Sequence, residues 1–353
     1  MTPALDGSIA SVRARLRDAG ALDCHEETVM QAWMHGRALD HGRRRAETFL
    51  PAALRAELPH LAADLAAMAH VRSEHPADDG SARLLVELAD GQTVESVLLP
   101  REGVCVSTQV GCAVGCVFCM TGRDGLLRQL GSAEIVAQVA LARARRPVRK
   151  VVFMGMGEPA HNLDNVMDAI ELLADAGGLA HKNLVFSTVG DRRVFDRLPR
   201  GRVKPALALS LHTTRADLRA TLLPRAPRID PAELVEEGER YARATGYPIQ
   251  YQWTLLGGVN DGDDELDAIA RLLEAKYAVM NFISWNAVEG LPYARAERDR
   301  AEEMVRLLHR RGVLAKLRDS AGQDVEGGCG QLRARAAAAR GAARVAWPIA
   351  RVR

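Results

Sequence analysis

The sequence predicts an α/β protein with a small N-terminal helical domain, a short β extension and a parallel sheet that curls into a full or partial barrel. From about residue 104 onward, apolar runs typical of buried strands alternate with runs of helical spacing, through about six β/α units. Before residue 104 the pattern is first helical and then hairpin-like. In barrels of this kind the residues that carry chemistry lie at the carboxyl ends of the strands.

The first 80 residues contain two helical segments. Residues 8–20 end on Gly20, and residues 27–39 have apolar side chains at helical spacing. Residues 81–104 predict a β-hairpin, because two β-type runs, 84–88 and 94–99, flank the turn dipeptide Asp90-Gly91.

The β/α units occupy residues 105–332. We expect Ser132 to cap a helix over residues 132–146, with Glu134 in its first turn. Another helix begins at Asp230-Pro231, with Glu233 at its third position. The expected strands cover residues 149–154, 183–189, 206–211, 249–256, 279–285 and 313–318, and further helices cover residues 163–173, 264–275 and 296–312.

Three thiols stand within eight positions, at Cys112, Cys116 and Cys119 in the run CAVGCVFC. Thiolates are the usual ligands of a [4Fe–4S] cluster, and three of them leave one iron open to a small molecule with an amine and a carboxylate. The alternative is a structural zinc site with Cys105 as the fourth ligand. The spacing favours the iron–sulfur cluster.

The number of cysteines and the lack of long apolar runs indicate in which compartment the protein works. Six cysteines in 353 residues are too few for a secreted disulfide framework. No signal segment opens the chain, and no apolar run approaches the ~18 residues of a membrane span. We therefore expect a cytoplasmic protein with reduced thiols and no membrane contact.

The net charge is only +2, but arginines cluster at residues 43–45, 143–150 and 192–204, and an Ala/Arg-rich tail without acids covers residues 333–353. These islands fit a local phosphate-binding surface, or they solvate helix faces.

Five separated motifs resemble the RlmN/Cfr family of radical S-adenosylmethionine (SAM) RNA methyltransferases. They are CVSTQVGC from Cys105, the cysteine loop in GCAVGCVFCMTGRDGLLRQL, VVFMGMGEP at 151–159, LSLH at 209–212 and GGCGQL at 327–332. The resemblance covers residues 85 to 332. It implies a partial (β/α)6-type radical SAM barrel over residues 105–332, preceded by an RNA-binding helical domain.

The resemblance also implies the site residues. One [4Fe–4S] cluster is held by Cys112, Cys116 and Cys119. A glycine-rich strand end brings the backbone close to SAM, and Glu158 accepts its ammonium. The implied SAM contacts are Gly157, Glu158, Ser187, Ser210, Leu211, His212 and Asn286. Cys24 matches nothing in the family and reads as a small helical side chain.

The implied mechanism uses two further cysteines. The Cys329 thiolate takes a methyl group from one SAM, and a radical derived from a second SAM removes hydrogen from that S-methyl group. The carbon radical adds to an adenine, Glu95 takes the ring proton, and Cys105 attacks the Cys329 sulfur to release the product as a transient disulfide.

The implied reaction is methylation of C2 of an adenosine in 23S rRNA, with tRNA as a second substrate. C8 methylation uses the same five cysteines and stays open. A radical SAM activase or maturase acting on protein has no use for Cys105 and Cys329, and a non-enzymatic iron–sulfur sensor of RNA would not cleave SAM. The implied partners are RNA and an electron donor such as flavodoxin or ferredoxin, acting on a monomer.

The chain departs from the family pattern at three places. Gly327-Gly328 replaces the usual small pair before the carrier cysteine, which suits a more mobile loop. Residues 319–322 lack the Arg often found there, and residues 283–285 lack the common Pro before Asn286.

Overall fold

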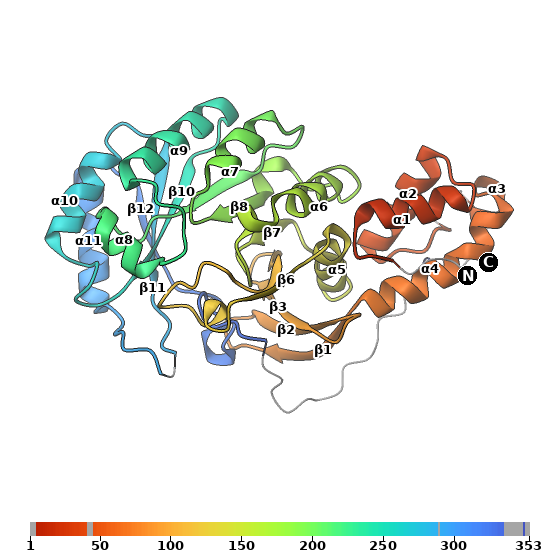
Figure 1. Cartoon of the computed structure of the whole chain (residues 1–353), viewed down its shortest axis with the longest axis horizontal. Helices are drawn as coiled ribbons and strands as arrows, with labels where there is room; N and C mark the ends of the chain where they lie inside the picture. Colours follow the sequence, from red (N-terminus) through yellow and green to blue (C-terminus); the bar gives the residue numbers. More distant parts are fainter. Residues whose placement is uncertain (1–4, 41–44, 289, 335–348, 350–353) are drawn as a thin grey trace.

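The computed structural model of the chain describes residues 5–40, 45–288, 290–334 and 349. Figure 1 shows an elongated molecule with a group of N-terminal helices at one end and a helix-covered sheet in the larger remaining part. Arg43 and Arg44 of the arginine cluster 43–45 and most of the tail 333–353 lie outside the described residues.

The N-terminal helices are α1 (Ile9–Asp18), α2 (Asp23–His35), α3 (Ala46–Phe49) and α4 (Ala52–Met68). Their apolar faces bury Leu16, Trp33 and Leu61 completely. α1 and α2 also pack against α5 (Ser132–Arg143) of the larger part.

Ser132 does not cap α5 as the sequence predicted. The N-cap is Gly131, and its N–H is bonded by the Glu134 carboxylate at 2.8 Å. The Ser132 hydroxyl is fully buried and instead accepts the N–H of Ile9 at 2.9 Å. The Ser132 side chain, which the local sequence predicted to cap the helix, is thus bonded to Ile9, 123 residues away.

One sheet runs in the order β1-β2-β3-β4-β7-β8-β9-β10-β11-β12. Its first four strands are antiparallel neighbours, and from β4 to β12 all neighbours are parallel. The strands are β1 (Ala69–Pro76), β2 (Ala82–Leu88), β3 (Thr93–Leu99), β4 (Gly103–Cys105), β7 (Lys150–Phe153), β8 (Leu184–Thr188), β9 (Ala206–Ser210), β10 (Ile249–Leu255), β11 (Ala278–Ser284) and β12 (Ala315–Arg318).

The predicted α/β class with a partly closed parallel sheet is confirmed, and so is the hairpin, which is β2 and β3. β1 was not predicted. It lies in the stretch expected to be helical and extends the hairpin, with Ala69, Val71 and Ser73 buried and their neighbours Arg72 and Glu74 exposed. Because the hairpin continues into the parallel strands through β4, the β extension and the barrel share one sheet.

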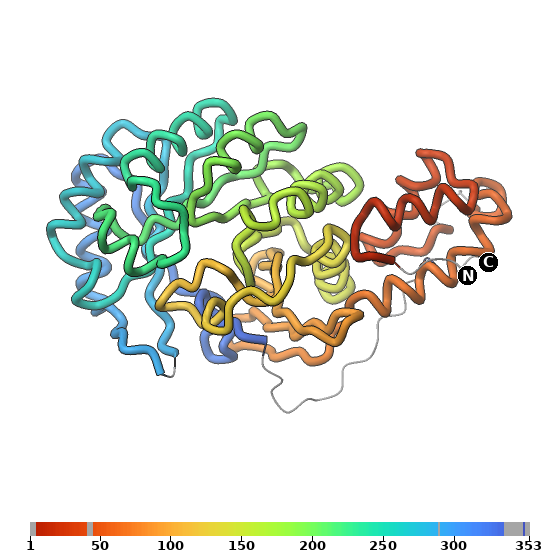
Figure 2. Tube along the Cα trace, viewed as in Figure 1, coloured from red at the N-terminus to blue at the C-terminus, as the bar shows by residue number. Residues whose placement is uncertain are grey.

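Helices cover the outer face of the parallel strands (Figures 1 and 2). α9 begins as predicted, since the Asp230 carboxylate accepts the Ala232 N–H at 2.8 Å. The remaining helices of this part are α6 (Leu163–Asp175), α7 (Arg192–Arg197), α8 (Ala216–Leu222), α9 (Pro231–Thr245), α10 (Asp263–Leu272) and α11 (Arg298–Arg310).

A separate two-stranded ribbon of β5 (Gln109–Gly111) and β6 (Leu126–Gln129) flanks the cysteine loop. Among the described residues, no helix combines the length and the apolar character that crossing a membrane requires.

Candidate active site

A pocket opens where the parallel strands end. The segments that follow β5, β7, β8 and β9 all line it, together with residues of β10 and β11 and the loop that carries Cys329. Of the residues implied by sequence, those that line it are Cys112, Cys116, Cys119, Gly157, Glu158, Ser187, Ser210, His212 and Cys329.

The three thiols of the cysteine loop meet at this pocket. The loop is fixed by backbone bonds from Val117 N–H to Leu222 O (3.1 Å) and from Arg225 N–H to Val114 O (3.2 Å), which tie it to the end of α8 and the segment that follows. Burial raises the pKa of Cys112 to about 12 and raises the pKa values of Cys116 and Cys119 as well. The metal-free thiols are therefore neutral, and a bound metal must displace their protons.

The donor set fits a cluster better than a single ion. The three thiols converge from one loop and are free, with apolar neighbours around them. Within the described ranges, no three His, Cys, Asp or Glu side chains stand close enough to hold one metal ion. Cys105 is not on the cysteine loop: it lies in β4, and Cys329 is the thiol that affects its pKa. Three thiols on one loop, with Cys105 apart from them on β4, suit a [4Fe–4S] cluster better than a tetrahedral zinc site, which takes four protein ligands.

Glu158 follows β7 at the pocket wall and is buried. Its carboxylate accepts the Ala160 and Val189 N–H groups, each at 3.0 Å, and its own N–H donates to Gln109 Oε1 at 2.7 Å. Burial raises the pKa of Glu158 to about 7, although the hydrogen bonds oppose that shift. A cation beside the carboxylate would favour its charged form.

Gly157 shows why glycine precedes this carboxylate. Its φ is +104°, and a Cβ at this position would come within 2.6 Å of the Gln109 side chain. The glycine lets the strand end lie directly on β5, which places the Glu158 carboxylate next to the cysteine loop.

His212 is a buried, hydrogen-bonded histidine that lines the pocket. Its Nδ1 accepts the Thr254 N–H at 3.0 Å, and its ring meets Phe118 edge-on with the centroids 5.0 Å apart. Burial lowers its pKa to about 3, so the ring is neutral. The neighbouring Leu211 side chain lies in the hydrophobic core and does not line the pocket, so any contact with a ligand falls to its backbone.

Asn286 lies behind the pocket and holds the Cys329 loop. Its Nδ2 donates to Cys329 O at 2.9 Å and to Ser320 Oγ at 3.1 Å, and its Oδ1 is buried without a protein partner. A Cβ on Gly328 would lie 2.6 Å from Asn286 Nδ2. Gly328 is therefore needed because Asn286 packs closely against it. This reason differs from the loop mobility that the sequence led us to expect.

Cys329 lines the pocket and lies near enough to Cys105 to affect its pKa, whereas Cys105 itself does not line the pocket. Cys105 is half-buried in β4, and Cys329 is exposed on its loop. Burial raises the pKa of Cys105 far above its ordinary value, and the nearby Cys329 raises it further. All six cysteines are free thiols, so the structure shows no disulfide.

Glu95 does not face the pocket. It is buried in β3, where its carboxylate is ion-paired with Arg83 and accepts the Arg333 and Ala334 N–H groups at 2.8 and 3.1 Å. The residue thus reaches the segment after Cys329, and in this arrangement both of its carboxylate oxygens accept bonds from protein donors.

The arginine islands seen in the sequence are mostly used within the fold. Arg145 pairs with Glu74, and Arg202 pairs with Asp175. Arg146 donates to the carbonyl oxygen of Leu99 at 3.0 Å. For the clusters 143–150 and 192–204, a structural or solvating role therefore fits better than a free phosphate-binding surface.

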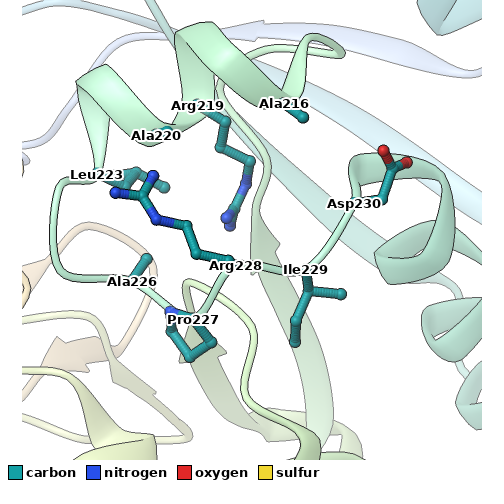
Figure 3. A pocket seen from close by; sticks show the side chains of 9 residues that line it. All are labelled: Ala216, Arg219, Ala220, Leu223, Ala226, Pro227, Arg228, Ile229 and Asp230. Carbon is teal, nitrogen blue, oxygen red and sulfur yellow. The ribbon is translucent and has the colours of Figure 1, made fainter.

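A basic hollow that the sequence analysis missed lies beside the cysteine loop (Figure 3). It is formed by α8 and residues 223–230, and the side chains of Arg219 and Arg228 reach into it, while Asp230 stands apart from both. Arg219 is buried, its guanidinium donates to the carbonyl oxygens of Val189 and Ser210, and its Nε has no partner.

Among the described residues neither Arg219 nor Arg228 forms an ion pair. Burial, with a smaller contribution from Arg228, lowers the pKa of Arg219 to about 10. Only the spacing of Arg219 with the apolar Leu218 and Leu222 on α8 could have indicated that it points inward.

The chain thus has a loop of three free thiols at the carboxyl edge of its parallel strands. Residues 106–273 match the Radical SAM superfamily. The crystal structure of a radical SAM methyltransferase from Sphaerobacter thermophilus superposes with a TM-score of 0.81 and 35% identity, covering 94% of this chain and 100% of that one.

Two relatives are more similar in sequence. A protein of Aromatoleum aromaticum named "Probable RNA methyltransferase" is 74% identical over 327 residues, which are 93% of this chain and 92% of that protein. One of Leptothrix cholodnii with the same name is 70% identical over 324 residues, 92% of this chain and 93% of that protein. The chain therefore belongs to the radical SAM superfamily and to the methyltransferase family of these relatives.

The expected cluster ligands can be tested one at a time. Replacing Cys112, Cys116 or Cys119 by Ala removes one of the three thiolates, so we expect the reconstituted protein to lose the brown charge-transfer absorbance and about one full complement of iron and sulfide. The control is Cys24→Ala, at an exposed helical position, which should keep both. Retention of iron by all three variants, or stoichiometric zinc in an active wild-type protein, would contradict the assignment.

Proposed function

We propose that this protein is a radical SAM RNA methyltransferase of the RlmN/Cfr type that methylates C2 of an adenosine in 23S rRNA, with tRNA as a second substrate. It works in the cytoplasm as a monomer. The observation that carries the proposal is the exposed Cys329 in the lining of the pocket that also holds the three thiols of the cysteine loop, with Cys105 nearby on β4, the strand next to β7. A radical enzyme that only activates a protein has no use for this second pair of thiols.

The residues at the pocket suit the two cofactors. Cys112, Cys116 and Cys119 would hold the cluster, and the bound cluster would supply the electron that cleaves SAM. Glu158 would accept the SAM ammonium, because its carboxylate retains lone pairs after bonding two N–H groups. The Ser187 and Ser210 side chains at the same edge offer hydroxyl groups to the rest of SAM.

The carrier step suits the exposure of Cys329. Its sulfur is reachable from the pocket, so it can displace the methyl group of SAM, forming the S–CH₃ bond as the sulfonium–methyl bond breaks and S-adenosylhomocysteine leaves. After the methyl carbon has joined the adenine, the Cys105 sulfur attacks the Cys329 sulfur. The bond from that sulfur to the product carbon breaks with its electron pair on the carbon, which takes up a proton and becomes the methyl group, and a Cys105–Cys329 disulfide forms. The unpaired electron that radical addition leaves on the adenine would return to the bound cluster.

The proton on the ring carbon needs a base, and the family assigns this role to Glu95. For Glu95 to reach a substrate, the segment of Arg333 and Ala334 must first release the carboxylate. We therefore place its action as a base in a state that RNA induces.

The basic hollow of Figure 3 supports RNA as the substrate. Arg225 and Arg228 are exposed on the segment that is bonded to the cysteine loop, and Arg228 has no acidic partner among the described residues. Such arginines suit backbone phosphates of an RNA bound across the pocket mouth. Regiochemistry at C2 or C8 is not fixed by these residues, and C2 follows the resemblance.

Trapping tests the proposed function directly. Cys105→Ala should accept the methyl group on Cys329 and join the RNA but fail to release it, because no thiol is left to attack the Cys329 sulfur. We expect a nuclease-sensitive shift on a denaturing gel, which the double variant Cys105→Ala/Cys329→Ala should lack. Normal turnover by Cys105→Ala would show that Cys105 is only a buried strand residue.

The hollow can be tested by its salt dependence. Arg228→Ala removes one cation, so it should weaken RNA binding several-fold and lower the slope of log affinity against log salt by about one. The control is Arg240→Ala, an exposed arginine on α9 that pairs with Glu237. Unchanged RNA affinity together with slower reduction by flavodoxin would instead assign the hollow to an acidic electron donor.

A further inference from the structure

We infer that the Arg83–Glu95 ion pair fixes the position of Cys329, so both residues act as positioning residues when Cys329 receives the methyl group. We call this ion pair the clasp. This inference rests on the proposed function, because it concerns the step in which Cys329 receives a methyl group. It gives Glu95 a role that is separate from taking a proton, and it gives Arg83 a role that the resemblance does not assign.

The loop of Cys329 is held on both sides by the β extension. Four residues before Cys329, the Val325 carbonyl accepts Arg83 Nε–H at 2.6 Å. Four and five residues after it, the Arg333 and Ala334 N–H groups bond to Glu95 Oε2. The loop therefore begins at one partner of the ion pair and ends at the other.

The ion pair between Arg83 and Glu95 joins the two points at which the loop of Cys329 is held. Arg83 Nη1 donates to Glu95 Oε1, and both side chains are almost fully buried, with 6% and 1% of their surface exposed. A buried arginine–carboxylate pair holds its geometry tightly, because losing either partner leaves an unpaired charge. The two strands that carry them, β2 and β3, pair directly, so the base of the clasp is rigid.

Further hydrogen bonds also join the loop of Cys329 to the β extension. The Gly322 N–H donates to Asp79 Oδ2 and the Asp78 N–H to Asp324 Oδ2, each at 3.0 Å, and Thr93 Oγ1 donates to Ala334 O at 3.1 Å. On the other side of the loop, the Met120 N–H donates to Gly330 O at 2.8 Å. These contacts place Cys329 between the cysteine loop and β4, where Cys105 lies.

A positioning role and a role as a base lead to different expectations for the transfer of a methyl group to Cys329. Transfer of a methyl group from SAM to Cys329 involves no adenine, so a residue that serves only as the base for the adenine proton is not needed. A residue that sets the position of Cys329 is needed, since small displacements of a nucleophile slow such reactions strongly.

The experiment measures methylation of Cys329 by SAM in the cluster-loaded protein without RNA, followed by peptide mass spectrometry. We expect Arg83→Met and Glu95→Gln each to slow it about ten- to a hundredfold. Arg83→Lys, which keeps the charge beside Glu95, should restore part of the rate. The matched control is Arg72→Met, because Arg72 forms an exposed ion pair with Glu87 across β1 and β2. A wild-type rate in Glu95→Gln or in Arg83→Met overturns the clasp.

A second readout does not depend on the enzymatic activity. Opening the clasp should speed hydrogen exchange at the Arg333 and Ala334 amides and alter the rate of Cys329 alkylation by iodoacetamide. The double variant Arg83→Met/Glu95→Gln leaves no buried unpaired charge and guards against a folding defect of the single variants. If the wild type fails to methylate Cys329, the proposed function fails. Exchange at the two amides that does not change in any variant would still overturn the clasp.

Discussion

The convergence of parallel strand ends at one edge of the sheet is the constraint on which the site depends. Because β7, β8 and β9 run in the same direction, Glu158, Ser187 and Ser210 arrive together although up to 52 residues separate them in the chain. The cysteine loop follows the short ribbon strand β5 and lies on the same edge, where its backbone is bonded to the end of α8. Gly157 makes this approach sterically permissible.

The antiparallel extension supplies the second half of the machinery. β2 and β3 carry Arg83 and Glu95, and β4 carries Cys105 into the parallel sheet. Since the sheet is continuous, the loop of Cys329 is held relative to the cysteine loop by a rigid frame. The frame thereby limits the range of positions open to Cys329, the residue that we propose as the methyl carrier.

Local pattern and spacing predicted much of this. Alternating apolar runs indicated the β/α units, the Asp90-Gly91 turn indicated the hairpin, and the spacing of the three cysteines indicated their common site. Ser132 and Glu95 show where such reasoning stops. Their decisive partners, Ile9 and the segment of Arg333, lie 123 and 238 residues away, so no window of local sequence contains the bond.

The buried Arg219 and the strand β1 were missed for a related reason. Arginine is usually exposed, and the cause of the Arg219 burial is the pair of carbonyl groups at the ends of β8 and β9 that it bonds. β1 is mixed in polarity, and pairing with β2 rather than its own propensity makes it a strand.

Mass spectrometry of total RNA from a strain that lacks this protein tests the central claim most directly. The account predicts that one methyladenosine disappears from 23S rRNA, that it co-migrates with a 2-methyladenosine standard, and that the wild-type gene restores it while a Cys329→Ala gene does not. An unchanged set of methyladenosines in all RNA classes would contradict the account.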